Sequence, residues 1–185
     1  MNTTIVNTCD KIYSLLNEIE GKPTTPPTLY ICLEGVIDSD YQFISVLILF
    51  LLPSRKVFLV DLLELQGAAF NIAISDSKSL RSILESPNIP KIFFSVRDDA
   101  RALYAHFKVS LKAVHDLQLL EAASRPEARY LSKLEDCMLK HTLLNNDDLL
   151  YWQRVKISGQ VSVSQFSSVS LRFWIVLRHL KLSVM

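Results

Sequence analysis

The nine residues Ile44 to Leu52, ISVLILFLL, form the longest apolar run of the chain, and only Ser45 interrupts it. A helix that crosses a bilayer needs about 20 apolar residues, so this run is far too short to span a membrane. Apolar residues occupy both faces that a strand would present here, which is typical of a strand buried on both sides. We therefore predict a central, mostly buried strand in a sheet.

The composition is that of one globular domain. The chain has 185 residues, of which 49% are hydrophobic and 21% charged, enough for a hydrophobic core. The net charge of +1 gives no overall attraction to nucleic acid or anionic membranes, so any basic surface must be local. The N-terminal MNTTIVNTCDK lacks the charged-then-apolar layout of a signal peptide.

The cysteine pattern predicts the compartment. The chain has an odd number of widely spaced cysteines and no C-x-x-C motif: Cys9, Cys32 and Cys137. We therefore expect neither a disulfide framework nor a zinc site, and we expect a reducing intracellular compartment.

A short amphipathic helix is predicted near the N-terminus, because apolar residues recur there at helical spacing: Ile12, Leu15, Leu16 and Ile19. Asn7 or Thr8 would cap it. The segment GKPTTPPT, residues 21–28, cannot continue a helix. We expect residues 1–28 to be this helix and a Pro/Thr linker.

The next segments read as strands and then as alternating helices and strands. Strands are predicted over Leu29–Val36, Phe43–Leu52 and Val57–Leu63, with short polar connections that suit antiparallel neighbours. A helix through Leu80 and Leu84 follows and begins near Ser77. After it we predict a strand over Lys91–Val96, a helix over Asp99–Phe107, a strand over Val114–Leu119 and a helix over Glu127–Leu143. The last helix would point Leu131, Leu134 and Met138 inward. This order predicts the α/β class, with a mixed sheet flanked by helices.

The last forty residues are less informative. VSVSQFSSVS, residues 161–170, favours no structure, and LRFWIVLRHLKLSVM, residues 171–185, fits a helix and also partly fits strand alternation. Both alternatives stay open.

Two acidic positions could carry chemistry. Glu34 lies inside the apolar segment LYICLEGV, where a buried acid is costly unless it is paired or bound to metal. Asp98 and Asp99 follow the apolar segment KIFFSV and open a helix. Periodicity alone favours an exposed face for Glu34 and a helix-capping role for the Asp pair. Carboxylates at the ends of neighbouring strands can nevertheless share Mg²⁺ or Mn²⁺, and two-metal phosphoryl chemistry uses several of them.

The chain resembles a known family in four stretches, which follow one another in this order: LYICLEGV, ISVLILFLLPSRKVFLVDLLEL, SLRSILESPNIPKIFFSVRDDARALYAHF and AVHDLQLLE. They resemble the opening of a 3'-5' exonuclease domain of the ribonuclease D and Werner type, in the DEDD superfamily. The resemblance runs from about Leu29 to Glu121. It implies a ribonuclease-H-like fold, with three antiparallel strands and then parallel strands alternating with helices.

The resemblance also implies four acidic metal ligands in three motifs. The first, Asp-x-Glu, reads Cys32-Leu33-Glu34 here, so Glu34 matches and Cys32 replaces the aspartate. The second matches Asp99 at a helix start. The chain thus retains two of the four expected ligands, and a soft thiol such as that of Cys32 is a poor ligand for magnesium. We interpret Cys32 as a small buried residue.

The third motif, Tyr-x-x-x-Asp or a His with an Asp five residues later, is missing. The three candidate positions pair Tyr130 with Leu134, Tyr151 with Val155 and His141 with Asn146, and none of these pairs fits. Asp147 and Asp148 lie nearby without the family spacing, and a solvated loop explains them.

Other positions are placed by the same resemblance. Asp116 matches an aspartate that is common in this strand of the family, with a structural or site-adjacent role. Arg97 and Arg101 give local positive charge beside Asp99, as do Lys108 and Lys112 further along. These basic residues would contact phosphates if they cluster near the sheet edge, and would otherwise form an ordinary solvated helix face.

The segment after residue 145 departs from the family. We predict an exonuclease-like domain over 29–145, incomplete at its C-terminal end, and a divergent tail over 146–185. A gene product with unrelated sequence after about Ser158 is one hypothesis for this loss of resemblance.

The function that we predict is nucleic-acid binding, at RNA or DNA 3' ends, by an exonuclease domain with weak or lost catalysis. Glu34 and Asp99 would be the catalytic and metal residues, with Arg97 and Arg101 on nucleic acid. The alternatives are an active exonuclease that needs Mg or Mn, and a non-functional fragment. We expect an intracellular location, cytoplasmic or nuclear, and no membrane association. The sequence alone also allows a protein partner.

Overall fold

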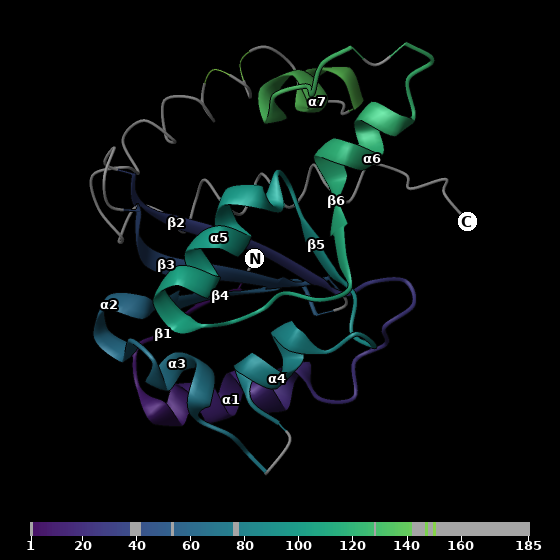
Figure 1. Cartoon of the computed structure of the whole chain (residues 1–185). Coiled ribbons are helices and arrows are strands. Elements are labelled where there is room, and N and C mark those ends of the chain that lie inside the picture. Colours follow the sequence, from purple (N-terminus) through teal and green to yellow (C-terminus); the bar gives the residue numbers. More distant parts are fainter. Residues whose placement is uncertain are drawn as a thin grey trace. The chain divides into compact units, whose positions relative to one another are not determined.

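The computed structural model describes residues 2–37, 42–52, 54–75, 78–127, 129–141, 147 and 150. The elements follow the order β1 (Asn2–Val6), α1 (Cys9–Ile19), β2 (Leu29–Ile37), β3 (Gln42–Leu51), β4 (Lys56–Asp61), α2 (Leu62–Leu65), α3 (Ala68–Asn71), α4 (Leu80–Glu85), β5 (Lys91–Phe93), α5 (Val96–Phe107), β6 (Val114–Asp116), α6 (Leu117–Ala123) and α7 (Leu134–His141) (Figure 1). The chain divides into two compact units, Met1–Leu117 and Gln118–Met185.

The first unit is built on one six-stranded sheet with the strand order β1-β4-β3-β2-β5-β6, and Figure 1 labels all six strands. The neighbours β4, β3 and β2 are antiparallel. The pairs β2–β5 and β5–β6 are parallel. The predicted α/β class, with three antiparallel strands followed by parallel ones, is therefore confirmed.

The strand β3 is central, as the apolar run predicts. Its residues Leu47, Leu49 and Leu51 belong to the main core, and the alternate residues Ile48 and Phe50 on the other face are also buried. Both faces of β3 are thus removed from water, which explains why this segment lacks the polar alternation of a half-exposed strand.

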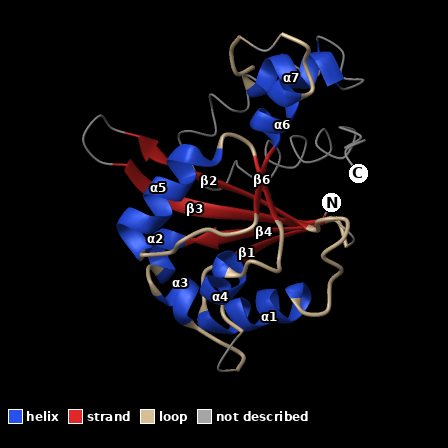
Figure 2. Ribbon diagram, turned by 45° about the vertical axis from the view of Figure 1, so that its right-hand side comes forward, coloured by secondary structure: helices blue, strands red, loops and turns tan. Residues whose placement is uncertain are grey.

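Helices cover one face of the sheet with an apolar layer. The helices α1, α3 and α4 lie together on one side of it in both views (Figures 1 and 2). Their contribution to the core consists of Ile12, Leu15, Leu16, Ile19, Ala69, Phe70, Leu80, Ile83 and Leu84. The residues Leu29, Ile31, Phe58 and Val60 of β2 and β4 face them in the same cluster.

The N-terminal segment carries a strand in addition to its predicted helix. The helix α1 begins after Thr8, one of the two predicted capping residues. The strand β1 was not predicted, and it pairs in parallel with β4 at the edge of the sheet. Lys56 of β4 also forms an ion pair with Glu18 of α1. Residues 2–19 therefore belong to the same sheet and core as the later strands.

The third predicted strand, Val57–Leu63, is too long at its C-terminal end. Leu62 and Leu63 lie in the short helix α2 instead. The Asp61 carboxylate accepts hydrogen bonds of 3.1 Å from the amides of Leu63 and Glu64. This cap ends the strand and starts the helix, although the residues on both sides are equally apolar.

Several later predictions are wrong in part. The strand predicted over Lys91–Val96 stops at Phe93, and the helix predicted from Asp99 already begins at Val96. The strand predicted over Val114–Leu119 stops at Asp116, and the helix α6 begins at Leu117. The helix predicted over Glu127–Leu143 begins only at Leu134, and Leu131, predicted to point inward, is 50% exposed.

An ion-pair network connects α6 and α7 inside the second unit. The Glu121 side chain is only 4% exposed, and it lies 3.2 Å from Arg125 and 3.4 Å from Lys140. Arg125 also donates a hydrogen bond of 2.6 Å to the Tyr130 carbonyl. This last contact includes Tyr130, which lies in the part of the predicted helix that is not helical in the structure.

Some sequence predictions fall outside the described residues: the start near Ser77 and the segments 161–170 and 171–185. The cap of α4 is Ser79, which forms a reciprocal capping box with Ser82. Over the part of the chain that the structure describes, none of the helices has both the length and the apolar character needed to cross a membrane.

Candidate functional site

Glu34 lies in β2 next to a bulge in the sheet. It pairs with Val46 of β3, whereas the next residue, Gly35, pairs with Ile44. Ser45 is therefore the extra residue, and its hydroxyl donates a hydrogen bond of 3.0 Å to the Glu34 carbonyl. Such bulges are often found beside functional sites, because they change the direction of a side chain.

Asp99 lies in the first turns of α5, and it contacts the main chain of β2 at Leu33. Among the residues that the structure describes, β2 pairs with β5 only at Leu29 and Tyr30, and its later residues have no partner strand on that side. The Leu33 main chain uses this free edge to hydrogen-bond the Asp99 carboxyl, a contact that favours the ionised form.

Burial opposes this hydrogen bond and dominates at Asp99. Burial, together with the negative charges of Glu34, Asp98 and Asp116, raises the pKa of the Asp99 carboxyl to about 7. The structure therefore brings Glu34 and Asp99 into the same electrostatic neighbourhood, as the sequence predicts. Their role as catalytic and metal-binding residues remains a prediction.

Cys32 belongs to the same group of side chains. It lies two residues before Glu34 on β2, and therefore on the same face of the strand. Burial raises the pKa of the Cys32 thiol, and the charges of Glu34 and Asp99 raise it further. The thiol is thus protonated at neutral pH without metal, and its soft sulfur is a poor ligand for magnesium.

Asp116 at the end of β6 holds the start of α5. Its two carboxylate oxygens accept hydrogen bonds of 2.9 Å from the amides of Ser95 and Val96. These are orphan donors of the first helical turn, and a negative charge there also offsets the helix dipole. The structural role that the sequence allowed for Asp116 is therefore the one that the contacts explain.

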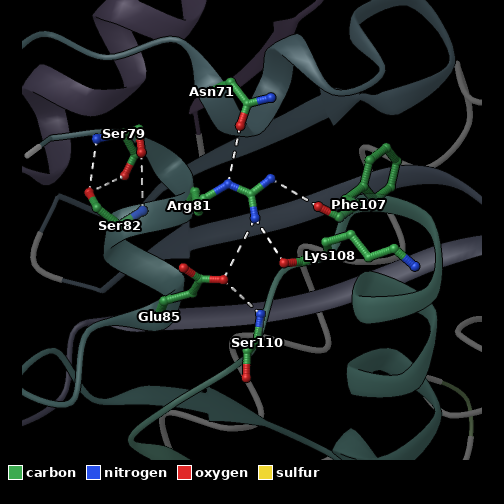
Figure 3. Close-up of polar contacts among 8 residues, drawn as sticks. All are labelled: Asn71, Ser79, Arg81, Ser82, Glu85, Phe107, Lys108 and Ser110. Atoms are coloured by element: carbon green, nitrogen blue, oxygen red, sulfur yellow. Dashed lines mark hydrogen bonds and ion pairs between the residues drawn. The ribbon is translucent and has the colours of Figure 1, made fainter. Parts of the chain in front are cut away.

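Arg81 of α4 holds the opposite end of α5 (Figure 3). Its guanidinium donates hydrogen bonds of 2.9 Å to the carbonyls of Phe107 and Lys108, and one of 3.1 Å to Asn71. Glu85 lies 3.7 Å from Arg81 and accepts a hydrogen bond of 2.9 Å from the Ser110 amide. The helix that carries Asp99 is thus fixed at both ends by charged side chains.

The basic residues predicted beside Asp99 lie on the solvent face of α5. The side chains of Arg97 and Arg101 are 90% and 67% exposed. Each is near Asp98, at 3.6 Å and 3.4 Å respectively. Lys108, at the end of the same helix, and Lys112, in the loop before β6, are exposed as well.

The residues present do not complete a two-metal site. Such sites use several carboxylates to hold and neutralise the ions. Within the described ranges, no three His, Cys, Asp or Glu side chains are placed to share a metal ion. Glu34 and Asp99 supply two carboxylates, Asp116 is engaged by the amides of α5, and Cys32 supplies a protonated thiol.

Sequence reasoning missed three contributors to this region: the Leu33 main chain, the Ser45 hydroxyl and the Arg81 guanidinium. The first is a main-chain group, which no residue pattern reports. Ser45 was visible as the only polar residue in the apolar run, and this interruption is a signal that could have predicted the bulge.

Several solved structures are similar to this chain. Trypanosoma brucei RNase D in complex with RNA U12 is 19% identical, with a TM-score of 0.75 over 97% of this chain and 62% of its own. Escherichia coli RNase D is 19% identical, with a TM-score of 0.56 over 97% of this chain and 51% of its own. The EXD2 exonuclease domain soaked in Mg and dGMP is 21% identical, with a TM-score of 0.53 over 90% and 88%. At these identities the likeness establishes the fold.

The chain spans about three fifths of the Trypanosoma RNase D chains that it matches. No curated protein matches it by sequence. The sequence profile described as "3'-5' exonuclease" matches residues 37–156, more than half of the chain. This match begins after Glu34, includes Asp99 and reaches into the predicted divergent tail. The chain therefore belongs to the 3'-5' exonuclease domain family.

Proposed function

We propose that this chain binds nucleic acid at single-stranded 3' ends and cleaves it weakly or not at all. The observation that carries the proposal is Cys32, whose protonated thiol takes the place of a carboxylate beside Glu34 and Asp99. The fold is that of the exonuclease domains, and α5 presents the exposed cations Arg97 and Arg101, which offer a surface for nucleic acid even without cleavage.

The similar structures support nucleic acid as the ligand class. Trypanosoma brucei RNase D was solved in complex with RNA U12 and also with GMP. Escherichia coli RNase D is described as an exoribonuclease involved in structured RNA processing. By analogy, we propose RNA as the first ligand to test and DNA as the second.

The expected loss of cleavage follows from charge. Two closely spaced divalent cations need several negative ligands, and Glu34 and Asp99 provide at most two. With a pKa of about 7, Asp99 is moreover only partly ionised at neutral pH. We therefore propose Glu34 and Asp99 as the remaining metal-contacting pair, with low affinity for Mg²⁺ or Mn²⁺.

An active, metal-dependent 3'-5' exonuclease is the alternative. It is favoured by the retained pair of Glu34 and Asp99 in one electrostatic neighbourhood. Structures of the EXD2 exonuclease domain were obtained after soaks in Mg and in Mn. This alternative needs a further ligand from outside the described residues.

A binding and degradation assay separates the two functions. The full chain is mixed with a 5'-labelled single-stranded oligonucleotide, with EDTA, Mg²⁺ or Mn²⁺, and both anisotropy and product length are followed. We expect binding in EDTA and an intact 3' end in all conditions. Stepwise shortening from the 3' end with Mg²⁺ or Mn²⁺, lost in the matched Glu34→Gln variant, would support the active enzyme and contradict lost catalysis.

We also propose an intracellular location, cytoplasmic or nuclear. Cys9 is a free thiol and exposed, which suits a reducing compartment. A protein partner is a second kind of ligand, and co-purification with and without nuclease treatment would distinguish direct partners from those bridged by nucleic acid.

A further inference from the structure

The solvent face of α5 carries a row of basic and aromatic side chains that the proposed site does not use. Arg97, Arg101, Tyr104 and Lys108 recur at steps of three or four residues, so they lie along one side of the helix. We call these four residues the α5 stripe. Each of the four is exposed, and Tyr104 is one of the large apolar side chains left in solvent, at 59% exposure.

The cations of the α5 stripe remain available to a ligand. The nitrogen of Arg97 nearest Asp98 is 3.6 Å away, too far for a hydrogen bond, and that of Arg101 is at 3.4 Å. Such exposed pairs contribute little energy. A phosphate can therefore engage either guanidinium, because two of its oxygens can accept the paired hydrogen bonds that the planar guanidinium donates.

The orientation of the Tyr104 ring is favoured by its contact with Lys108. The Lys108 ammonium lies 5.5 Å from the centre of the Tyr104 ring and donates a hydrogen bond of 3.3 Å to the Ala105 carbonyl. The ammonium thus favours one orientation of the ring. An exposed aromatic ring flanked by cations is the arrangement on which unpaired bases stack while the backbone follows the positive charge.

The length of the stripe fits a short strand. From Arg97 to Lys108 the helix rises by about 16 Å, at roughly 1.5 Å per residue. A stacked nucleic-acid strand advances by about 3.4 Å per nucleotide, so the stripe is as long as about five stacked nucleotides. Its N-terminal end is the helical turn that carries Asp99.

We infer that the α5 stripe binds single-stranded nucleic acid, with Arg97 and Arg101 on phosphates and Tyr104 stacked on an unpaired base. This inference rests on the proposed function and deepens it, because it specifies unpaired bases as the ligand and assigns α5 as the surface. An acidic protein segment would satisfy the arginines but would give Tyr104 no base to stack on.

The test measures anisotropy of a 5'-fluorescein oligoadenylate, single-stranded or annealed to its complement, with the full chain in EDTA over a range of salt. Tyr104→Ala should weaken binding of the single strand about five- to a hundredfold, while Tyr104→Phe retains it. Arg97→Gln and Arg101→Gln should each lower the salt slope by about 0.7.

The matched controls are Tyr13→Ala and Lys11→Gln on α1, where Tyr13 is 42% exposed. Both should leave affinity and salt slope unchanged. The Tyr104→Ala change should not affect the duplex, whose bases are already stacked. Circular dichroism and thermal melts confirm that each variant folds.

The outcomes separate this inference from the proposed function. If the parent binds the single strand but Tyr104→Ala behaves like Tyr13→Ala, the α5 stripe is not the surface and only this inference fails. Equal losses on single strand and duplex, or equally tight binding of polyglutamate, would overturn the specificity for unpaired bases. A parent that binds no single strand refutes the proposed function as well.

Discussion

The Asp116 carboxylate, at the end of β6, accepts a hydrogen bond of 2.9 Å from the amide of Val96, which is the first residue of α5. The residue before the helix, Ser95, has a left-handed conformation (φ 60°) and makes no side-chain cap of its own. The cap of α5 is therefore supplied by a neighbouring strand that comes twenty residues later in the sequence.

Replacing Asp116 with alanine should lower the free energy of unfolding by about 1–2 kcal/mol, because two amides of the first turn lose their acceptor. Asp116→Asn keeps one acceptor oxygen and should lose less. Urea denaturation measures both. The control is Asp10→Ala in the exposed first turn of α1, which should cost less than Asp116→Ala. Equal losses at the two positions would contradict the assigned role of Asp116.

Arg81 provides a second test of how α5 is held. Arg81→Gln should lower the free energy of unfolding by about 1.5–3 kcal/mol, because two carbonyls at the end of α5 lose a charged donor. Arg81→Lys should restore only part of this, since a single ammonium cannot replace the guanidinium fork. Arg129→Gln, at a side chain that is 87% exposed, serves as control. A full rescue by lysine would show that charge alone matters at this position.

The buried Lys91 predicts a pH dependence of stability. Its side chain is fully buried, and its ammonium donates hydrogen bonds of 3.1 Å and 2.8 Å to the carbonyls of Ile83 and Ser86. Burial lowers the pKa of Lys91 from 10.5 to about 8. Below pH 8 the lysine is charged in both states, and its desolvation destabilises the fold.

Between that pH and 10.5 the folded chain releases the Lys91 proton while the unfolded chain keeps it. Stability from this group should therefore rise with pH in that window, by up to about 1.4 kcal/mol per pH unit. As the pH rises through this window, the free energy of unfolding of the parent should increase relative to that of Lys91→Met. A difference that stays flat across the window would show that Lys91 is not desolvated.

Restoring a hard ligand at position 32 tests the candidate metal pair. Cys32→Asp should be less stable than the parent without metal, because a third carboxylate joins Glu34 and Asp99. Millimolar Mg²⁺ or Mn²⁺ should raise its melting temperature, whereas the parent should respond much less. We expect no full nuclease activity, because the third motif is absent. A strong Mg²⁺ shift in the parent would contradict the incomplete site, and Cys32→Asn is the uncharged control.

Much of the sheet follows from hydrophobic pattern. The run around β3 predicted a central strand because only a position buried on both faces tolerates it. The edge strand β1 was missed although Thr3 to Val6 are β-branched, since a short edge strand has weak alternation and depends on its partner β4. The start of α2 was missed for a related reason, because Asp61 decides it and the apolar residues do not.

The sequence predicted which residues to consider for the candidate site, but it did not predict the contacts that surround them. Glu34 and Asp99 followed from a family resemblance. Their setting depends on contacts between segments distant in sequence, such as Leu33 with Asp99 and Asp116 with Val96. No periodicity records such contacts, so the raised pKa of Asp99 could not be foreseen.

The extra residue Ser45 reverses the parity of β3. After the bulge, the odd-numbered residues Leu47, Leu49 and Leu51 enter the main core, yet even-numbered Ile44, just before the bulge, joins the same core. Strict two-residue alternation would have placed the Ile44 side chain on the face of the sheet that bears Glu34. One inserted serine thus shifts the alternation of side chains by one residue, and it keeps Ile44 off the face of the sheet that bears Glu34.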